Sequence, residues 1–483
     1  MLNTKPTKNM TNTMATFLKA TAAQGHLHLD KSSFVSFVFL VFGLLSVADA
    51  QTLYEGARLI PGDNSPVIER SAFLVEDGRI THVGQHGQFH PPALARRVDL
   101  SGKTVMPTLI ATHVHPGFQR GVTYLRENYT ADTIVNDLNR AVYFGVSVAQ
   151  SQGIEAGEVM YQVRADQQAG KLAPTARLMV AGRGIGSPNA GPGGATYAGM
   201  AYEVTTEAES RQAVQELAAR KVDIVKIWVD DRNGRAPKLS PRLYRAIIDE
   251  AHRHGLRINA HVFYHADAVD LVDAGIDGFA HLVRDMVMDD ALVTAIVQRG
   301  VYVMGNLSSP RKSTYASLPD WLSPGNPLLQ LLGESMTVAA LDRLRAYFGT
   351  REPKAVEGAR QRYAILERSL AKLSRAGARI ILGADTGLED HLFGMAEHLE
   401  LEAMVNAGMT AAEGIVAATS RSAEYLQLKT KGRLRPGFDA DFLVLDANPL
   451  ETITNTRRIA RVILNGDEID RAAQSQVLKR TGR

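Results

Sequence analysis

The segment TLIATHVH, residues Thr108–His115, is an apolar run that ends in two histidines separated by a single residue. A short apolar run of this kind predicts a buried β-strand. Successive side chains of a strand point to opposite faces, so His113 and His115 are expected to share one face. Two imidazoles on the same face of a strand are a candidate metal site.

Seven further apolar segments follow along residues 107–430, and stretches with helical spacing of apolar residues lie between them. Eight strands that alternate with helices predict an α/β fold, specifically a (β/α)8 TIM barrel, with a doubly wound sheet as the alternative. The seven segments are GVSVAQ, ARLMVAG, DIVKIWV, LRINAHV, DGFAHLV, VYVMGNL and RIILGAD. Long stretches after the third and seventh strands are expected to shape a substrate pocket.

The sequence before and after the predicted barrel contains short segments of alternating apolar and polar residues, which indicate β structure. Residues 51–106 contain TLYEGARLI and SAFLVEDGRITHVG, and residues 431–483 contain GRLRPGFDADFLVLDANPL and VILNG. We expect these two regions to pair into one small β-sandwich domain, with the barrel of residues 107–430 inserted between its halves.

Residues 1–50 have the pattern of a leader and secretory signal peptide. A Lys-containing polar stretch precedes the apolar run Phe34–Val47, and small residues follow up to Ala50. The run is too short for a typical membrane span. We therefore expect cleavage after Ala50, no stable membrane span afterwards, and a periplasmic or secreted location, with an uncleaved anchor as the alternative. A second His-x-His pair, His26 and His28, precedes the run and is expected to lie outside any folded domain.

The composition excludes several classes of function. The 483 residues are 45% hydrophobic and 22% charged, and the formal net charge is only +3. No block of Lys and Arg resembles a phosphate-binding stripe, so nucleic acid is not an expected partner. The chain has no cysteine, which excludes disulfides, thiolate zinc sites and cysteine nucleophiles. Any metal must therefore bind to His, Asp, Glu or a modified Lys.

Metal-capable side chains recur near the ends of the predicted strands, where a barrel would bring them to one face. Singly, each has an ordinary explanation: a hydrogen-bonded histidine, a snorkelling lysine, or a turn aspartate. Together they form a far more specific pattern, and a buried lysine among them requires an explanation because burying its charge is costly. The six are His113 and His115 on the first strand, Lys226 on the fourth, His261 on the fifth, His281 on the sixth and Asp385 on the eighth.

This series of residues resembles that of the amidohydrolase superfamily of metal-dependent hydrolases, in the branch near imidazolonepropionases and prolidase-like dipeptidases. The similarity extends to the closing segments AGMTAAEGIVAATSRSAEYLQL and KGRLRPGFDADFLVLDANPL. The resemblance implies two divalent metal ions, for which zinc is expected. It implies that one ion is held by His113, His115 and Asp385, that the second is held by His261 and His281, and that a carboxylated Lys226 bridges both.

The resemblance also implies a mechanism. A carbamate on Lys226 would replace a buried ammonium and offer an oxygen to each cation. Two ions would lower the pKa of a bridging water, giving hydroxide, and would polarise the carbonyl under attack. Asp385 would be the catalytic residue that takes the proton and passes it to the leaving nitrogen.

Several positions depart from the family's usual pattern. Thr108 and Ala111 stand where the family often has Gly and Asp before the histidine pair. Phe263 stands two residues after the third histidine, where many dipeptidase-like members have an aromatic hydroxyl, and Tyr264 comes one residue later. Dipeptide specificity is therefore not implied. His398, in the helical stretch AEHLELEAM, is expected to be a solvated helix residue.

We therefore expect a binuclear metal-dependent hydrolase that cleaves an amide or related C–N bond of a small molecule, such as an N-acyl amino acid, dipeptide or aryl amide. One alternative is the same metal centre acting on a lactone, carbamate or phosphotriester, since the metals activate water for any of these electrophiles. A second is a non-catalytic barrel scaffold, which the retention of all six candidate ligands disfavours. The sequence leaves a homo-oligomer open.

Overall fold

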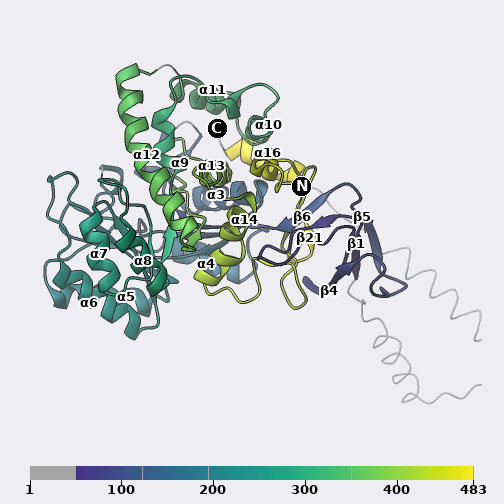
Figure 1. The fold of residues 1–483 in the computed structure, drawn as a ribbon, viewed down its shortest axis with the longest axis horizontal. Coiled ribbons are helices and arrows are strands. Elements are labelled where there is room, and N and C mark those ends of the chain that lie inside the picture. Colours follow the sequence, from purple (N-terminus) through teal and green to yellow (C-terminus); the bar gives the residue numbers. More distant parts are fainter. Residues whose placement is uncertain (1–50, 122, 194, 350, 482–483) are drawn as a thin grey trace, which may run out of the picture. The chain divides into compact units, whose positions relative to one another are not determined.

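The computed structural model describes residues 51–121, 123–193, 195–349 and 351–481 (Figure 1). The chain divides into two units, residues 1–50 and residues 51–483. The predicted leader and signal peptide, with the upstream histidine pair, fall on residues 1–50 and lie outside the described residues.

Parallel strands make up two sheets in the middle of the chain. A three-stranded sheet has the order β11-β10-β7, and a seven-stranded sheet has the order β13-β12-β14-β15-β16-β17-β18. Each of the eight segments expected as strands contains one of them, whereas the short β12 and β13 were not expected. The bounds are β7 Leu109–Val114, β10 Val146–Ser151, β11 Arg177–Met179, β12 Ile185–Gly186, β13 Tyr202–Glu203, β14 Ile224–Val229, β15 Arg257–Val262, β16 Gly278–Phe279, β17 Tyr302–Met304 and β18 Arg379–Ile381.

Backbone hydrogen bonds connect the two parallel sheets at both sides. Beside β7, Thr112 N donates to Leu382 O, directly after β18, at 2.9 Å. Between the ends of β11 and the start of β14, Asp223 N donates to Val180 O at 2.7 Å. The strands expected from the sequence therefore follow one another in chain order, and β18 lies beside β7. The α/β class predicted from the sequence is confirmed.

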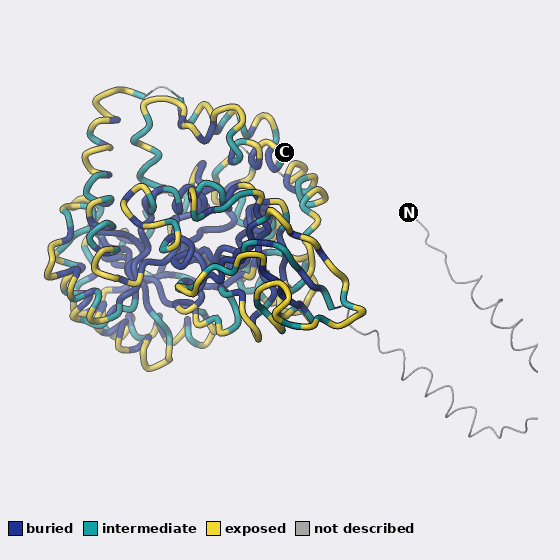
Figure 2. Tube along the Cα trace, turned by 45° about the vertical axis from the view of Figure 1, so that its right-hand side comes forward, coloured by how far each residue is buried: buried dark blue, intermediate teal, exposed yellow. Residues whose placement is uncertain are grey.

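Helices alternate with these strands and bury their apolar faces against them, so that the interior is continuous (Figure 2). Local sequence sets their starts: the Thr206 hydroxyl accepts from Glu209 N in a capping box before α5, and Pro241 opens α6. The helices are α3 Ala131–Tyr143, α4 Val159–Gln168, α5 Glu207–Ala219, α6 Pro241–Arg253, α7 His265–Asp273, α8 Asp290–Arg299, α9 Ser308–Arg311, α10 Pro327–Ser335, α11 Val338–Tyr347, α12 Pro353–Arg375, α13 Met395–Asn406, α14 Ala411–Ala418, α15 Ser420–Tyr425 and α16 Arg471–Thr481.

The two ends of the described chain meet in a pair of sheets, ordered β4-β3-β1-β5 and β2-β6-β19-β20-β21. The C-terminal β19 pairs antiparallel with the N-terminal β6. Tyr54 and Phe73 of the first sheet pack against Phe442 of the second, with ring centroids 5.1 and 5.2 Å apart, so the sheets share an apolar core. The strands are β1 Thr52–Glu55, β2 Arg58–Leu59, β3 Ser71–Glu76, β4 Arg79–Gln85, β5 Arg96–Asp99, β6 Thr104–Pro107, β19 Phe442–Leu445, β20 Ile459–Leu464 and β21 Asp467–Glu468.

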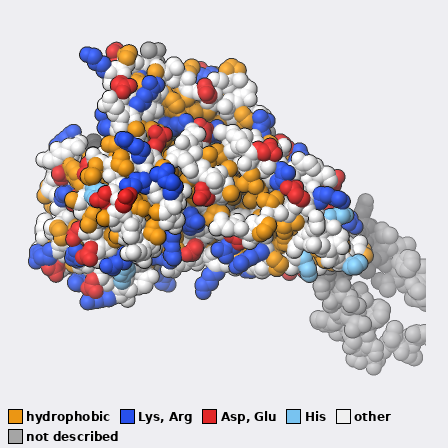
Figure 3. Space-filling model, in the orientation of Figure 1, with side chains coloured by type: hydrophobic (Ala, Val, Ile, Leu, Met, Phe, Trp, Pro, Cys, Tyr) orange, Lys and Arg blue, Asp and Glu red, His pale blue; other side chains and the backbone are white. Residues whose placement is uncertain are grey.

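The surface carries both signs of charge. On the face drawn in Figure 3, basic and acidic side chains are interspersed with apolar ones. Among the described residues, no helix combines the length and the apolar character needed to cross a bilayer.

Candidate metal centre

His113, His115 and Asp385 meet where β7 and β18 end. Nε2 of His113 lies 3.2 Å from Nε2 of His115. Oδ1 of Asp385 lies 3.1 Å from Nε2 of His115 and 3.3 Å from Nε2 of His113. All three residues are buried, and Asp385, four residues beyond the end of β18, adopts a φ of +59°. The two histidines leave their strand on the same face, as the sequence predicts.

The spacing of these three donors fits a divalent cation. Metal–ligand bonds of about 2.0–2.2 Å in tetrahedral or octahedral geometry place neighbouring donor atoms about 3.0–3.4 Å apart. Burial lowers the pKa of both His113 and His115, which favours the neutral imidazoles that metals bind. A cation in contact with both Nε2 atoms would satisfy two acceptors that otherwise face each other.

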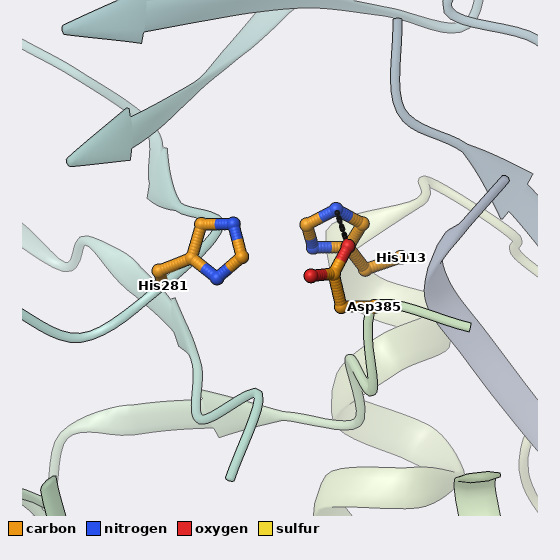
Figure 4. A group of neighbouring side chains, drawn as sticks. All are labelled: His113, His281 and Asp385. Atoms are coloured by element: carbon orange, nitrogen blue, oxygen red, sulfur yellow. Dashed lines mark ion pairs between the residues drawn. The ribbon is translucent and has the colours of Figure 1, made fainter. Parts of the chain in front are cut away.

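His281 and His261 extend this group from the neighbouring strands. Donor atoms of His113, His281 and Asp385 all lie within 4.8 Å of one another. Figure 4 shows the His281 ring facing His113 and Asp385 across the candidate site. The rings of His261 and His281 are 4.5 Å apart between centroids, and both residues are buried. Five of the six predicted ligands are thus placed by direct contacts or short ring distances.

Lys226 lies on β14 and is 1% exposed. Burial lowers the pKa of its ammonium to about 7, the charges of Arg232 and Arg284 act in the same direction, and the charge of Asp385 opposes them. An amine with a pKa near 7 is neutral in a substantial fraction of molecules near neutral pH, and only a neutral amine can add carbon dioxide. The Lys226 Nζ lies 5.6 Å from the centroid of the Trp228 ring.

Gly153 packs closely against Lys226, and no side chain fits at this position. It has a φ of +90°, and a Cβ at this position would lie 2.9 Å from Cβ and Cγ of Lys226 and from the ring of Trp228. A larger residue would therefore push against β14 at the point where Lys226 enters the site.

Asp230 is a site residue that the sequence reasoning missed. Its Oδ2 lies 2.8 Å from Nε2 of His261, so it orients that ring and leaves Nδ1 for a cation. Burial alone would raise the pKa of Asp230, but the hydrogen bond from His261 and the charge of Arg232 lower it to about 2. The sequence did contain a signal for Asp230: it lies four residues after Lys226 on the same extended stretch, and an even spacing in a strand places two side chains on the same face.

Replacing Asp230 with alanine is expected to weaken metal binding by about 10–100-fold, the usual cost of losing a carboxylate that orients a ligand histidine. Asp230→Asn, which keeps an acceptor oxygen, should lose less. The measurement is competition for zinc with a calibrated chelator. Asp231→Ala is the matched control, since Asp231 accepts instead from the hydroxyl of Tyr264. Equal affinities for Asp230→Ala and Asp231→Ala would show that Asp230 has no role in the site.

Asn306 and Arg284 were also missed. The Asn306 Nδ2 atom lies 2.9 Å from Nδ1 of His113 and 2.9 Å from Nδ1 of His281, and it donates to Ala280 O. The Arg284 Nη2 atom lies 3.0 Å from Nδ1 of His281. Asn306 lies near the end of the seventh predicted segment, two residues after β17, and Arg284 lies three residues after a predicted ligand. Neither position has a periodic signal that predicts the contact.

One of the two long loops, the loop after β11, packs against the segment that follows β7. Beyond β7, the hairpin of β8 (Gln119–Arg120) and β9 (Thr123–Tyr124) contacts the loop after β11. The rings of Phe118 and Tyr197 are 5.2 Å apart, and the hydroxyls of Tyr124 and Tyr197 form a hydrogen bond. Burial raises the pKa of the Tyr197 hydroxyl, and the negative charge of Asp385 acts in the same direction. We call Phe118, Tyr124 and Tyr197 the aromatic wall.

His398 does not have the environment expected for it. The prediction of a solvated helix residue is wrong: His398 is 1% exposed, with Nδ1 3.0 Å from the hydroxyl of Thr456 and Nε2 3.0 Å from Phe144 O. The ring connects α13 to the segments that contain Thr456 and Phe144. Contacts with residues so distant in the chain cannot be predicted from the spacing of apolar residues around His398.

The fold and the buried donors are those of an α/β enzyme whose candidate site lies at the carboxyl ends of its parallel strands. Residues 104–469 match the model of the amidohydrolase family. The chain belongs to this family, and it is a hydrolase that acts on carbon–nitrogen bonds.

Individual relatives have low sequence identity to this chain, but the alignments cover most of both proteins. The ochratoxinase of Aspergillus niger is 25% identical over 454 residues, which cover 86% of this chain and 85% of the relative. A solved Xaa-Pro dipeptidase with bound methionine has a TM-score of 0.68 at 21% identity, covering 87% of this chain and all of that one. The structure of phenylurea hydrolase B has a TM-score of 0.67 at 21% identity, covering 88% and 98%. At these identities the two solved structures indicate the fold alone.

Proposed function

We propose that the protein is a binuclear metal-dependent hydrolase that cleaves an amide or related C–N bond of a small molecule. The observation that carries the proposal is the triangle of buried donors formed by His113, His115 and Asp385, with edges of 3.1–3.3 Å. In this proposal these three residues would hold one ion, His261 and His281 would hold a second, and Lys226, carboxylated to a carbamate, would supply an oxygen to each. Zinc is the expected metal, since neutral imidazoles and carboxylates are ligands that suit it.

The bound ions would supply a water of lowered pKa and a polarised carbonyl. The remaining work falls to the chain. Asp385 accepts a proton at the carboxylate that also contacts His115, and it returns that proton to the leaving nitrogen. Asp230 and Asn306 hold the imidazole rings in place from behind. Phe118, Tyr197 and their neighbours limit access of water to the mouth.

We propose further that the eight parallel strands close into a (β/α)8 barrel of residues 107–430, and that residues 51–106 and 431–483 form a β-sandwich. The bonds between β18 and β7, and the shared core of the two terminal sheets, support this architecture. In a barrel, catalytic residues lie at the carboxyl ends of the strands. Five of the six candidate ligands lie close to these ends, and Lys226 lies in the middle of β14.

Three cationic side chains near the centre favour a substrate that carries a carboxylate. Arg284 contacts His281, Arg232 lies beside Asp230 at 3.5 Å, and Lys312 is close enough for its pKa to respond to the charge of Asp385. Among the expected substrates, N-acyl amino acids and dipeptides carry such a group, and the aromatic wall offers a surface for an aryl substituent. The name of one similar structure, a Xaa-Pro dipeptidase, agrees with this class.

The test combines metal analysis with a hydrolysis screen. Purified protein should contain two equivalents of divalent metal per chain and lose activity when a chelator removes them. The screen compares N-acyl amino acids and dipeptides, each also as its methyl ester, and aryl amides with lactones, carbamates and phosphotriesters. Free acids should be hydrolysed faster than their esters. Turnover confined to lactones or phosphotriesters, or undiminished turnover after metal removal, would refute the proposal.

Export is a separate proposal, motivated by the apolar run Phe34–Val47 and the small residues before Gln51. The mature protein is expected to begin at Gln51 and to be found in the periplasm or medium of an exporting host. N-terminal sequencing of protein recovered from those fractions is the measurement. An intact leader on the recovered soluble protein would contradict it.

A further inference from the structure

A second cavity of about 290 Å³ shares no lining residue with the candidate metal centre. One wall comes from the segment that follows β17 and includes Arg311, Tyr315 and Trp321. The opposite wall comes from Glu402 of α13 and from the 3-10 helix Ile453–Arg457 with its next residue. None of these side chains has a role in the proposed hydrolysis.

Positive charge exceeds negative charge in this cavity. Its lining contains three arginines, Arg311, Arg457 and Arg458, against two acids, Asp320 and Glu402. The Glu402 carboxylate alone serves two guanidiniums: Oε1 accepts from Arg311 Nη1 at 3.1 Å, and Oε2 accepts from Arg457 Nη2. Arg458 is exposed and has no carboxylate within ion-pair distance in the described part of the chain. The lining therefore has one positive charge more than it has negative charges.

Arg457 shows that the guanidiniums are held in place. It is 3% exposed, and its Nη2 also donates to His398 O at 3.1 Å. Its buried Nε has no hydrogen-bond partner within the described residues. Buried N–H groups in proteins almost always meet a protein atom, a water or an ion. A rigid arginine with an unused donor in the wall of a positively charged cavity indicates that an acceptor is missing.

We propose that this cavity binds a small anion with several acceptor oxygens, of the phosphate or carboxylate class, between Arg311 and Arg458. Guanidinium groups suit such ligands because their parallel N–H donors match pairs of oxygens. A volume of 290 Å³ corresponds to roughly ten waters at ~30 Å³ each, which suits inorganic phosphate or a di- or tricarboxylate. Arg457 lines the same cavity and shares Glu402 with Arg311.

Trp321 provides a reporter for the test. The chain has two tryptophans, so Trp228→Phe leaves Trp321, which lines the cavity, as the single fluorophore. Metal-loaded full-length protein with this change is titrated with inorganic phosphate and separately with citrate, at constant ionic strength. A saturable change in Trp321 fluorescence is expected with at least one of them, and the comparison distinguishes the phosphate from the carboxylate source.

Arg458→Gln should weaken that binding by at least about tenfold, the usual worth of one charge-assisted hydrogen bond. The matched control is Arg461→Gln, which removes the same charge from β20, where Arg461 pairs with Glu468 instead. Arg458 is exposed, so its replacement should leave the thermal unfolding midpoint unchanged. The absence of a saturable signal with both anions, or equal affinities in the two variants, would overturn the proposal.

Discussion

Replacing Asp385 with asparagine is expected to lower kcat by about 10²–10⁴-fold at saturating metal, with a much smaller change in KM. The loss corresponds to roughly 3–5 kcal/mol of barrier at 1.36 kcal/mol per decade. An amide oxygen can still contact a cation, so metal occupancy should persist in part. An amide has no basic site near neutral pH, so it cannot hold the transferred proton.

The measurement is a pH–rate profile of wild type and Asp385→Asn on any substrate that the screen identifies. The acidic limb of the profile should change only in this variant. Glu389→Gln is the control, because it removes an exposed carboxylate from the same loop. If Asp385→Asn kept a kcat close to that of wild type and an unchanged acidic limb, another group would have to accept the proton.

Lys226→Ala is expected to lose most of its bound metal and with it most of its activity. Loss of a residue that only orients a ligand typically weakens metal binding by about 10–100-fold. The loss of metal affinity in Lys226→Ala should be at least as large, because a bridging ligand contacts both ions directly. Short carboxylic acids should partly restore metal and turnover by supplying the missing oxygens. The low pKa of about 7 that burial gives Lys226 makes its neutral, carbon dioxide-reactive form abundant.

The bridging role has a readout that is independent of turnover. The intact mass of the wild-type protein should fall by the mass of carbon dioxide on acidification, because carbamates decarboxylate. Lys226→Met, which retains a long apolar side chain in the same space, should show no such change. A full complement of metal and normal turnover in Lys226→Ala would exclude a bridging lysine.

The sequence predicted the parallel strands and the convergence of their polar ends because both follow from local pattern. Apolar runs of strand length lie between helical stretches, and period two alone places His113 and His115 together. The contact of Asp385 with them required one further rule, that the carboxyl ends of such strands meet on one face. The roles of these residues in catalysis and metal binding stay predictions until the experiments above are done.

Residues that act through others were missed because their contacts depend on long-range packing. Asn306 reaches two imidazoles only because its backbone adopts a φ of +46° after β17, and nothing in VYVMGNL specifies that turn. Arg284 contacts His281, three residues before it, but the sequence has no periodic signal for that contact. His398 has its partners on segments far away in the chain, which no local pattern covers. Asp230 is the exception, since its even spacing from Lys226 could have been used.

The pairing of β19 with β6 has a consequence for the order in which the protein can be completed. During synthesis β6 emerges long before β19, so one of its edges has no antiparallel partner until nearly the whole polypeptide has been made. An unpaired strand edge is a template for association with other chains. A nascent chain must therefore remain protected until its last strands arrive. C-terminal truncations that remove β19 should accumulate as aggregates rather than as a smaller working enzyme.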